Sequence, residues 1–306
     1  MNKVFPKKYG IMFHHFHSIK HPKSAGSISK RDFKKIIKNI NIKNITSADK
    51  YLKKIEKICI TFDDSLKCQY DIAFPILKKL NIKAFWFIYT SSLKPDKNNI
   101  EVFRRFRYKK FKKFDDFYKK FLNYLDFKKN LILFLKENEK KIIKFKKDYS
   151  FYSFNEIKFR FIRDQFLTQK EYGFVIDKMY KDNNFNFKKE LKKIFLNKKD
   201  IKSLSDDGQI IGLHSHNHPT KISLLNKNTQ QKEYVSNKNI LEKIIKKKIT
   251  TSSHPSGDYS IQTLKILKKI GIILSFRSNI KIDKKFIGTK YQNLTIPRED
   301  HINLLK

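Results

Sequence analysis

The chain has 306 residues and carries 69 Lys and Arg against 29 Asp and Glu, which leaves a formal net charge of +40. Hydrophobic residues make up 40% of the chain and aromatic residues 14%, a composition that excludes an intrinsically disordered protein despite the charge. The low content of Gly (8) and Pro (7) excludes collagen-like and flexible-linker architectures.

The two cysteines, Cys59 and Cys68, are too few for a disulfide framework in a chain of this size. The first residues contain Lys and Pro where a signal peptide has an apolar run of roughly 7–15 residues. No run of about 18 apolar residues marks a transmembrane helix. We therefore expect a cytoplasmic protein without a transmembrane segment, and peripheral contact with a membrane surface stays open.

The excess positive charge suggests a nucleic-acid partner, because clustered cations gain affinity by releasing counterions from phosphate. Of the 69 cationic side chains, however, 61 are Lys and 8 are Arg. Bidentate recognition of phosphates and bases favours Arg. A solvated lysine-rich surface is therefore the favoured interpretation, with an acidic substrate, a membrane surface or nucleic acid as alternatives.

Apolar runs and amphipathic segments alternate at both ends of the chain. In order, the pattern predicts a strand at 9–16, a helix capped by Ser29 and Asp32, a strand at 57–62, a helix ending at 75–80, a strand at 84–89, a strand at 209–213, a helix at 233–247, a strand at 249–253, a helix from Ser260 to residue 269, and a strand at 272–276. This alternation is typical of a parallel α/β sheet, whose functional groups gather at the carboxyl ends of the strands.

Residues 95–205 have a different pattern, with aromatic residues at helical spacing between Lys and Arg. We expect a helical insertion here within a single domain that spans residues 1–306. The segment at 103–114 also fits a basic-aromatic nucleic-acid patch. Packing of its apolar face is the favoured interpretation.

Acidic and histidine residues follow several of the predicted strands. His214 and His218 lie four residues apart, so both imidazoles can reach one metal ion, and Asp64 is a third potential ligand. Two His and one carboxylate suit Zn²⁺, and also Fe²⁺, Co²⁺ or Ni²⁺. Asp63 would then be a general base, and His14 or His15 a general acid. Each motif taken alone also fits a helix cap, a turn or a packed histidine.

These residues stand in three strings: IMFH at 11–14, ITFDD at 60–64 and HSHNHP at 214–219. Together they resemble the polysaccharide deacetylases of the NodB-homology type, carbohydrate esterase family 4. The first motif of that family is TFDD followed by Gly, and the second is H-[ST]-x-x-H, usually followed by Pro. The resemblance covers about residues 9–95 and 206–300.

The resemblance implies a distorted (β/α) barrel and a metal-dependent hydrolase that acts on non-peptide carbon–nitrogen bonds. It would remove an N-acetyl group, less often an O-acetyl group, from a sugar in polysaccharide or lipopolysaccharide metabolism. By position in the motifs, Asp63 is similar to the catalytic base, and Asp64, His214 and His218 to the metal ligands. His14 resembles the general acid of a permuted branch of the family.

The sequence departs from the family pattern at two places. Ser65 stands where the first motif has Gly, and the third motif, Arg-x-Pro-[Tyr/Phe]-Gly, becomes SHPSG at 253–257. The family's base-orienting Arg is therefore missing, and Arg298 is a candidate replacement. The residues expected around the substrate and oxyanion are Ser65, Pro255, Ser256, Gly257 and Arg298.

Three functions follow from these observations. The first is deacetylation of an N-acetylated sugar linked to a nucleotide or a lipid, whose phosphates a basic surface would attract. The second is a catalytically degenerate barrel that binds a glycan or another anionic polymer. The third and least favoured is nucleic-acid binding.

Overall fold

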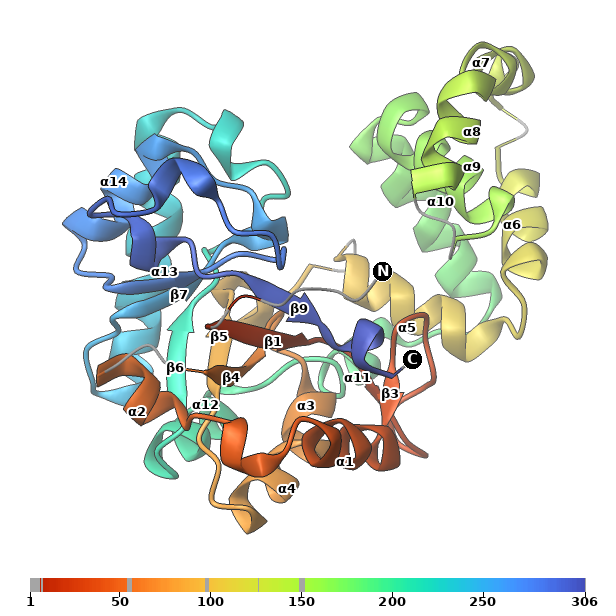
Figure 1. The fold of residues 1–306 in the computed structure, drawn as a ribbon. Coiled ribbons are helices and arrows are strands. Elements are labelled where there is room, and N and C mark those ends of the chain that lie inside the picture. Colours follow the sequence, from red (N-terminus) through yellow and green to blue (C-terminus); the bar gives the residue numbers. More distant parts are fainter. Residues whose placement is uncertain are drawn as a thin grey trace. The chain divides into compact units, whose positions relative to one another are not determined.

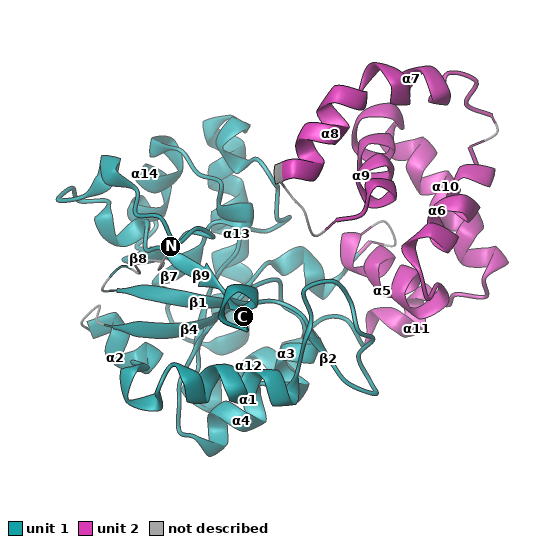
Figure 2. Ribbon diagram, turned by 45° about the vertical axis from the view of Figure 1, so that its right-hand side comes forward, with its two compact units in different colours: residues 1–95, 193–306 teal, residues 96–192 magenta. Residues whose placement is uncertain are grey.

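The computed structural model describes residue 6 and residues 8–53, 57–96, 99–125, 127–148 and 152–305 (Figure 1). Contacts divide the chain into two compact units, shown in separate colours in Figure 2. Unit 1 comprises Met1–Pro95 and Lys193–Lys306, and unit 2 comprises Asp96–Lys192. The insertion was expected at 95–205, whereas residues 193–205 pack with unit 1.

Unit 1 is built on a seven-stranded parallel sheet. Its strands are β1 (Tyr9–Phe13), β4 (Ile58–Phe62), β5 (Phe85–Ile88), β6 (Ile210–Leu213), β7 (Thr251–Ser253), β8 (Leu274–Phe276) and β9 (Arg298–Asp300). Their spatial order is β8-β7-β6-β5-β4-β1-β9, so neighbours in the sheet follow one another along the chain, except that β9 pairs with β1. All of these pairings are parallel, and the expected strand–helix alternation is confirmed.

The sheet curls into a nearly closed barrel. Ile296, two residues before β9, makes a parallel bridge to Phe276 at the end of β8, and its N–H donates to the carbonyl of Ser275. Since β9 is also paired with β1, this bridge joins the two edges of the sheet. The expected distorted (β/α) barrel is therefore confirmed.

Helices of unit 1 connect the strands. They are α1 (Lys30–Asn39), α2 (Ala48–Lys53), α3 (Lys67–Ile72), α4 (Phe74–Lys79), α12 (Lys198–Asp206), α13 (Lys227–Ile245) and α14 (Ile261–Lys269), and a short two-stranded sheet of β2 (Phe16–His17) and β3 (Ile28–Ser29) precedes α1. The predicted caps are confirmed. Ser29 and Asp32 form a capping box at α1, and Ser260 accepts from the Thr263 N–H at α14.

Aromatic rings fill the barrel of unit 1. The fully buried cluster includes Phe85, Phe87 and Phe276. On the other face of the sheet, toward the helices, the Phe62 ring stacks on Trp86 with centroids 4.2 Å apart. Cys59 belongs to this cluster, and burial raises the pKa of its thiol. This packed interior anchors the strands, so their carboxyl ends hold the following loops in defined positions.

Unit 2 is helical over its described residues. Its helices are α5 (Ile100–Lys110), α6 (Phe114–Asn123), α7 (Leu131–Glu137), α8 (Glu139–Asp148), α9 (Phe154–Phe161), which continues into a π-helical turn (Ile162–Phe166), α10 (Gln169–Asp182) and α11 (Phe187–Leu191). None of the helices described in either unit is long and apolar enough to cross a lipid bilayer.

Phenylalanine rings form the core of unit 2. Phe106, Phe117 and Phe121 are fully buried, and the ring of Phe159 lies 5.0–5.2 Å from those of Phe117 and Phe121. Of the aromatic side chains of the basic-aromatic segment, Phe103 and Phe106 are buried, and Tyr108, Phe111 and Phe114 are half-buried. The expectation that they pack in a core is confirmed, and a stack of exposed rings for nucleic-acid bases is absent from the described part of this segment.

Candidate active site

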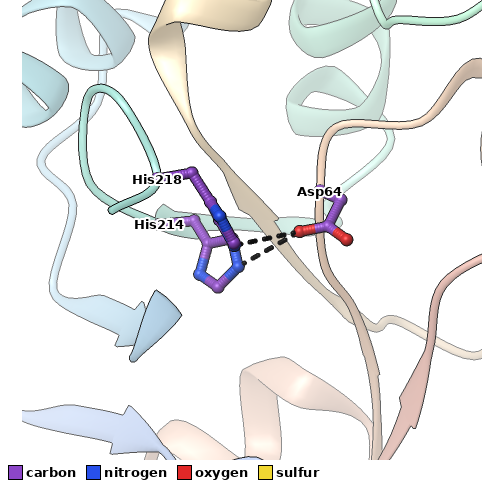
Figure 3. A group of neighbouring side chains, drawn as sticks. All are labelled: Asp64, His214 and His218. Atoms are coloured by element: carbon purple, nitrogen blue, oxygen red, sulfur yellow. Dashed lines mark ion pairs between the residues drawn. The ribbon is translucent and has the colours of Figure 1, made fainter. Parts of the chain in front are cut away.

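Asp64, His214 and His218 converge at the carboxyl ends of β4 and β6. Both His214 Nε2 and His218 Nε2 lie 3.4 Å from Asp64 Oδ1, as Figure 3 shows. One ligand atom from each residue lies within 4.8 Å of the other two. The three predicted ligands are therefore neighbours in the fold, although Asp64 precedes His214 by 150 residues in the sequence.

These separations suit metal coordination better than hydrogen bonding. An N–H···O hydrogen bond spans about 2.7–3.2 Å, shorter than either contact. A tetrahedral ion with bonds of about 2.0–2.2 Å keeps its ligand atoms about 3.4 Å apart. The nitrogen and oxygen atoms are thus spaced as ligands of one ion would be.

The hydrogen bond on the far side of His214 sets its tautomer. His214 Nδ1 lies 2.9 Å from the carbonyl oxygen of Ser253, so this nitrogen carries the proton and donates. Nε2, on the other side of the ring, faces Asp64 and is the nitrogen left to bind an ion. A backbone carbonyl behind a ligating imidazole is a common arrangement in metal sites, and it fixes the ring's orientation.

The loop that carries Asp64 has an unusual backbone. Asp64 and Ser65 have φ values of +72° and +59°, in the left-handed region that glycine adopts most easily. Ser65 is nevertheless buried, and its Oγ accepts from the N–H of Tyr89 at 3.1 Å. Ser65 therefore fastens the turn to the end of β5, and this bond offsets strain that a glycine would avoid.

Helix α13 holds the loop that carries His214 and His218. The Glu233 carboxylate accepts from the N–H groups of His216 and Asn217, at 3.0 and 2.7 Å, and from the Asn217 side chain at 2.7 Å. One turn later, Asn237 accepts from the His214 N–H at 3.0 Å. These bonds stabilise a loop in which Ser215 and His218 have positive φ.

Sequence reasoning missed Glu233 and Asn237. A signal was present, because the buried stripe of α13 combines polar and apolar residues at helical spacing, namely Gln230, Glu233, Asn237, Leu241 and Ile245. A buried carboxylate on such a stripe needs donors, and the adjacent loop supplies them.

Arg298 binds the expected base, Asp63, in a bidentate ion pair. Arg298 Nη1 donates to Asp63 Oδ1 at 2.7 Å, and Nη2 donates to Oδ2 at 2.6 Å. Nη2 also donates to Ser253 Oγ at 2.7 Å, and Ser253 Oγ donates to Asp63 Oδ2 at 3.1 Å. The serine in the position of the missing motif arginine thus contacts both the carboxylate and the arginine from β9.

Gly10 leaves room for this arginine. Gly10 is opposite Arg298 in the β1–β9 pairing, and a Cβ at Gly10 would lie 3.0 Å from Arg298 Cγ. The Arg298 side chain is therefore buried across β1, and its Nη1 also donates to Thr61 Oγ1 at 3.1 Å.

The carboxylates of Asp63 and Asp64 are both stabilised in the ionised form. Burial alone would raise the pKa of Asp63, but the Arg298 guanidinium and His214 hold it below its ordinary value. Burial likewise opposes ionisation of Asp64, yet the neighbouring histidines, His214 first among them, hold its pKa well below the ordinary value. Asp63 is thus a proton acceptor at neutral pH, and Asp64 is an anionic ligand.

His14, the expected general acid, lies beside Asp64. Its Nε2 is 3.8 Å from Asp64 Oδ2, and its side chain is 27% exposed. His301, which follows β9, is buried and engaged elsewhere. Its Nδ1 and Nε2 lie 3.0 and 3.1 Å from the carbonyl oxygens of Met12 and Gly26, so it supports the end of β1 and is not free to protonate a substrate.

The remaining expected residues follow β7. Pro255 is buried, whereas Ser256 is exposed and has a φ of +53°. Gly257 has a φ of +70°, and a Cβ there would lie 2.0 Å from Ser278 Oγ. This short turn follows Ser253, whose carbonyl supports His214. The oxyanion role of Ser256 stays a prediction.

The site has a buried part, here called the floor, and a partly exposed part, called the rim. Asp63, His214 and Arg298 have side chains at most 3% exposed, whereas those of Asp64, His218 and His14 are 19–27% exposed. A substrate therefore meets the ligand carboxylate and two imidazoles first, with the second carboxylate beneath them.

Comparisons with known proteins agree with this description. Residues 168–274 match the polysaccharide deacetylase family model, a span that includes His214 and His218. No curated protein matches the sequence. Among solved structures, the Streptococcus pyogenes deacetylase PplD in complex with acetate is 17% identical, with a TM-score of 0.55 over 99% of this chain and 98% of that chain.

Two further structures have the same fold. IcaB from Ammonifex degensii is 12% identical, with a TM-score of 0.54 over 95% of this chain and 91% of that one. A de-N-acetylase from Aggregatibacter actinomycetemcomitans is 13% identical, with a TM-score of 0.52 over 95% and 93%. The family-model match and the shared barrel together confirm that this chain resembles the polysaccharide deacetylases of the NodB-homology type.

Proposed function

We propose that the protein is a metal-dependent hydrolase that removes an N-acetyl group from a carbohydrate. The observation that carries the proposal is the convergence of Asp64, His214 and His218 beside a second carboxylate, Asp63, that is ionised by a buried arginine. A ligand set with an adjacent base and a partly exposed histidine is the arrangement that hydrolysis of an amide requires.

The residues present fit a divalent ion. Two imidazole nitrogens and one carboxylate oxygen are a donor set for Zn²⁺, with Fe²⁺, Co²⁺ and Ni²⁺ as alternatives. Zn²⁺ would be held by Nε2 of His214 and His218 and by the Asp64 carboxylate, and the His214 ring is oriented for this role. When bound, such an ion polarises the substrate carbonyl and lowers the pKa of water.

The protein's own groups account for the proton transfers. The Asp63 carboxylate accepts a proton from the water whose oxygen adds to the acetamide carbonyl carbon. Protonated His14 donates to the nitrogen as the carbon–nitrogen bond breaks, so acetate and an amine leave. Arg298 keeps Asp63 ionised and in place, and the backbone N–H of Ser256 would stabilise the oxyanion.

The net charge supports an anionic substrate. A surface with a net charge of +40 attracts anions, so a sugar linked to a nucleotide or lipid phosphate fits better than a neutral polymer. A cytoplasmic location would be consistent with such a precursor.

Acetate release from N-acetylglucosamine oligosaccharides and from UDP-N-acetylglucosamine tests the proposal. We expect activity that is lost on treatment with chelator and restored by Zn²⁺. Asp63→Asn should reduce the rate by at least about a hundredfold, and His214→Ala should lose both activity and bound metal. His17→Ala, a histidine on β2 that bonds Ser27, is the matched control and should retain both.

Full activity in His214→Ala would overturn the metal assignment. Oligosaccharide binding without acetate release, in a protein that binds metal substoichiometrically, would instead support the degenerate, glycan-binding alternative. Metal analysis of the purified protein separates these outcomes.

A further inference from the structure

Helix α7 of unit 2 is apolar, yet the described chain leaves one side of it exposed. Residues 131–135 read LILFL, and none of the seven residues of α7 is buried. Ile132 and Leu133 are 72% and 56% exposed. Isolated exposed apolar residues are common, but adjacent ones at such exposure on one short helix mark an interaction surface.

The other side of α7 explains why the helix is held in place. Phe134 and Leu135 pack against a buried cluster of Ile142, Ile157 and Phe161 from α8 and α9. The Phe134 ring also lies 4.8 Å from that of Phe166. These contacts hold α7 against the core through one face. Ile132 and Leu133 are therefore exposed on a helix that is packed in place.

Lysines flank these exposed apolar residues in the sequence. Residues 127–147 contain eight Lys, two Glu and no Arg. Lys129, Lys136 and Lys140 are exposed, and within the described chain they make no ion pair. Exposed apolar side chains flanked in sequence by exposed lysines are complementary to an anionic bilayer, whose headgroups meet the cations and whose acyl region accepts the apolar side chains.

We propose that Ile132, Leu133 and the lysines Lys129, Lys136 and Lys140 form a docking surface for an anionic lipid bilayer. Seven residues span about 10 Å, far less than a bilayer, so α7 lies in the interface and does not cross it. This inference does not depend on the proposed deacetylase activity, because every residue involved belongs to unit 2.

The lipid surface fits better than a nucleic acid or a protein. The exposed apolar side chains contribute nothing to phosphate binding, and the absence of Arg from 127–147 removes the side chain that makes bidentate phosphate contacts. A protein interface is enriched in Arg and aromatic residues and depleted in Lys, whereas residues 127–147 are rich in Lys and contain no Arg.

Co-sedimentation of the full chain with vesicles tests the proposal. Vesicles of phosphatidylcholine alone are compared with vesicles that contain phosphatidylglycerol, at low and high salt. We expect binding to the anionic vesicles only, weakened by salt. Ile132→Asn with Leu133→Asn should reduce the partition coefficient at least about tenfold. Lys129→Glu, Lys136→Glu and Lys140→Glu together should reduce it about a hundredfold or more.

Two sets of matched variants control for general effects. Phe174→Asn changes another apolar residue of unit 2 that is 56% exposed, and Lys170→Glu, Lys181→Glu and Lys189→Glu reverse the same number of exposed lysines elsewhere in that unit. We expect Phe174→Asn to bind like wild type and the lysine control to lose several-fold less than the α7 lysine variant.

Equal losses in the control sets would overturn the proposal, as would equal binding to neutral vesicles or no binding at all. Competition by duplex DNA together with indifference to the Ile132 and Leu133 changes would identify a nucleic-acid surface instead. Unchanged melting temperatures of the α7 variants exclude misfolding as the cause of a loss, because the substituted side chains are exposed.

Discussion

The barrel unit and the helical unit have nearly the same charge density but very different chemistry. Unit 2 contains 27 Lys and Arg against 14 Asp and Glu, and unit 1 contains 42 against 15, about one excess positive charge for every seven to eight residues in each. All nine histidines belong to unit 1, whereas 17 of the 28 phenylalanines belong to unit 2.

This contrast separates composition from function. Charge is spread evenly over both units, so it distinguishes neither. In the barrel the buried polar groups Asp63, Arg298 and Ser253 form a network at the site, whereas the core of the helical unit is built of aromatic and aliphatic side chains, and its buried Glu190 pairs with Arg105. Buried polar networks need exact partners, and rings need only volume, so the two units should respond differently to substitution.

The largest effect is expected for Arg298→Met in the barrel. Removing one partner of a buried ion pair costs about 3–5 kcal/mol of unfolding free energy, and a misplaced Asp63 should lower kcat about a hundredfold. Without the guanidinium, burial raises the pKa of Asp63, so the acidic limb of the activity profile should move to higher pH. Rate against pH and chemical denaturation measure these changes.

Stability has a matching dependence on pH. The folded-state pKa of Asp63 is lowered, so its contribution to stability is present above its ordinary value of 3.8 and is lost as the pH falls through the lowered value. Arg298→Lys keeps the charge without the bidentate geometry and should recover part of the rate. A pH profile that is unchanged in Arg298→Met would contradict a role for Arg298 in holding Asp63 ionised.

Phe117→Ala tests the helical unit. The side chain is fully buried between Phe103, Phe121 and Phe159, so its truncation should cost about 3–5 kcal/mol. Acetate release per folded molecule should not change, because the side chain belongs to no part of the site. Phe174→Ala, at an exposed position, should cost less than about 0.5 kcal/mol. A loss of kcat in Phe117→Ala without a loss of stability would contradict the view that the core of the helical unit affects stability and not the chemistry of the barrel.

Glu233→Gln should have an intermediate effect on the barrel. The amide can replace only one of the two accepting oxygens, so at least one N–H of the His216–Asn217 loop loses its partner, at a cost of about 1–3 kcal/mol. We also expect metal affinity to fall about tenfold by equilibrium dialysis. Glu242→Gln on the same helix keeps an acceptor for the Ile249 N–H and serves as the control. Equal metal affinity in the two variants would exclude a positioning role for Glu233.

The smallest effect is expected for surface lysines, whatever the unit. Lys202 pairs with Asp206 one turn along α12, and both side chains are more than half exposed. Lys202→Ala should change the unfolding free energy by at most about 0.5 kcal/mol. A larger loss in thermal or chemical denaturation would mean that the excess charge is structural after all.

Much of the barrel could be predicted because its strands are continuous apolar runs. β1 and β4 lie within the strands predicted at 9–16 and 57–62, although β1 already ends at Phe13. β9 was not predicted as a strand, since Arg298–Asp300 contains three charged residues and no apolar one. Its position depends on pairing with β1 and on the space above Gly10, which are tertiary properties.

The site shows the same division between local and distant signals. Asp64, His214 and His218 could be placed together because the strands of a parallel sheet have their carboxyl ends at the same edge, although β5 lies between β4 and β6. Arg298 could be named only as a candidate partner of Asp63, since nothing local fixes a contact across 235 residues. Glu233 and Asn237 were missed because their partners are backbone N–H groups, so the polar residues at helical spacing on α13 do not show what they bind.

The long separation between Asp63 and Arg298 also has a consequence for the order of folding. During synthesis, a nascent chain that has emerged as far as β8 can pair all the earlier strands, but it holds an acidic group in the floor of the site without its cation. The barrel cannot close until β9 arrives, so closure joins the first and last strands of the barrel. Such non-local closure is slow, and the open edges of β1 and β8 are exposed to wrong pairing until it occurs.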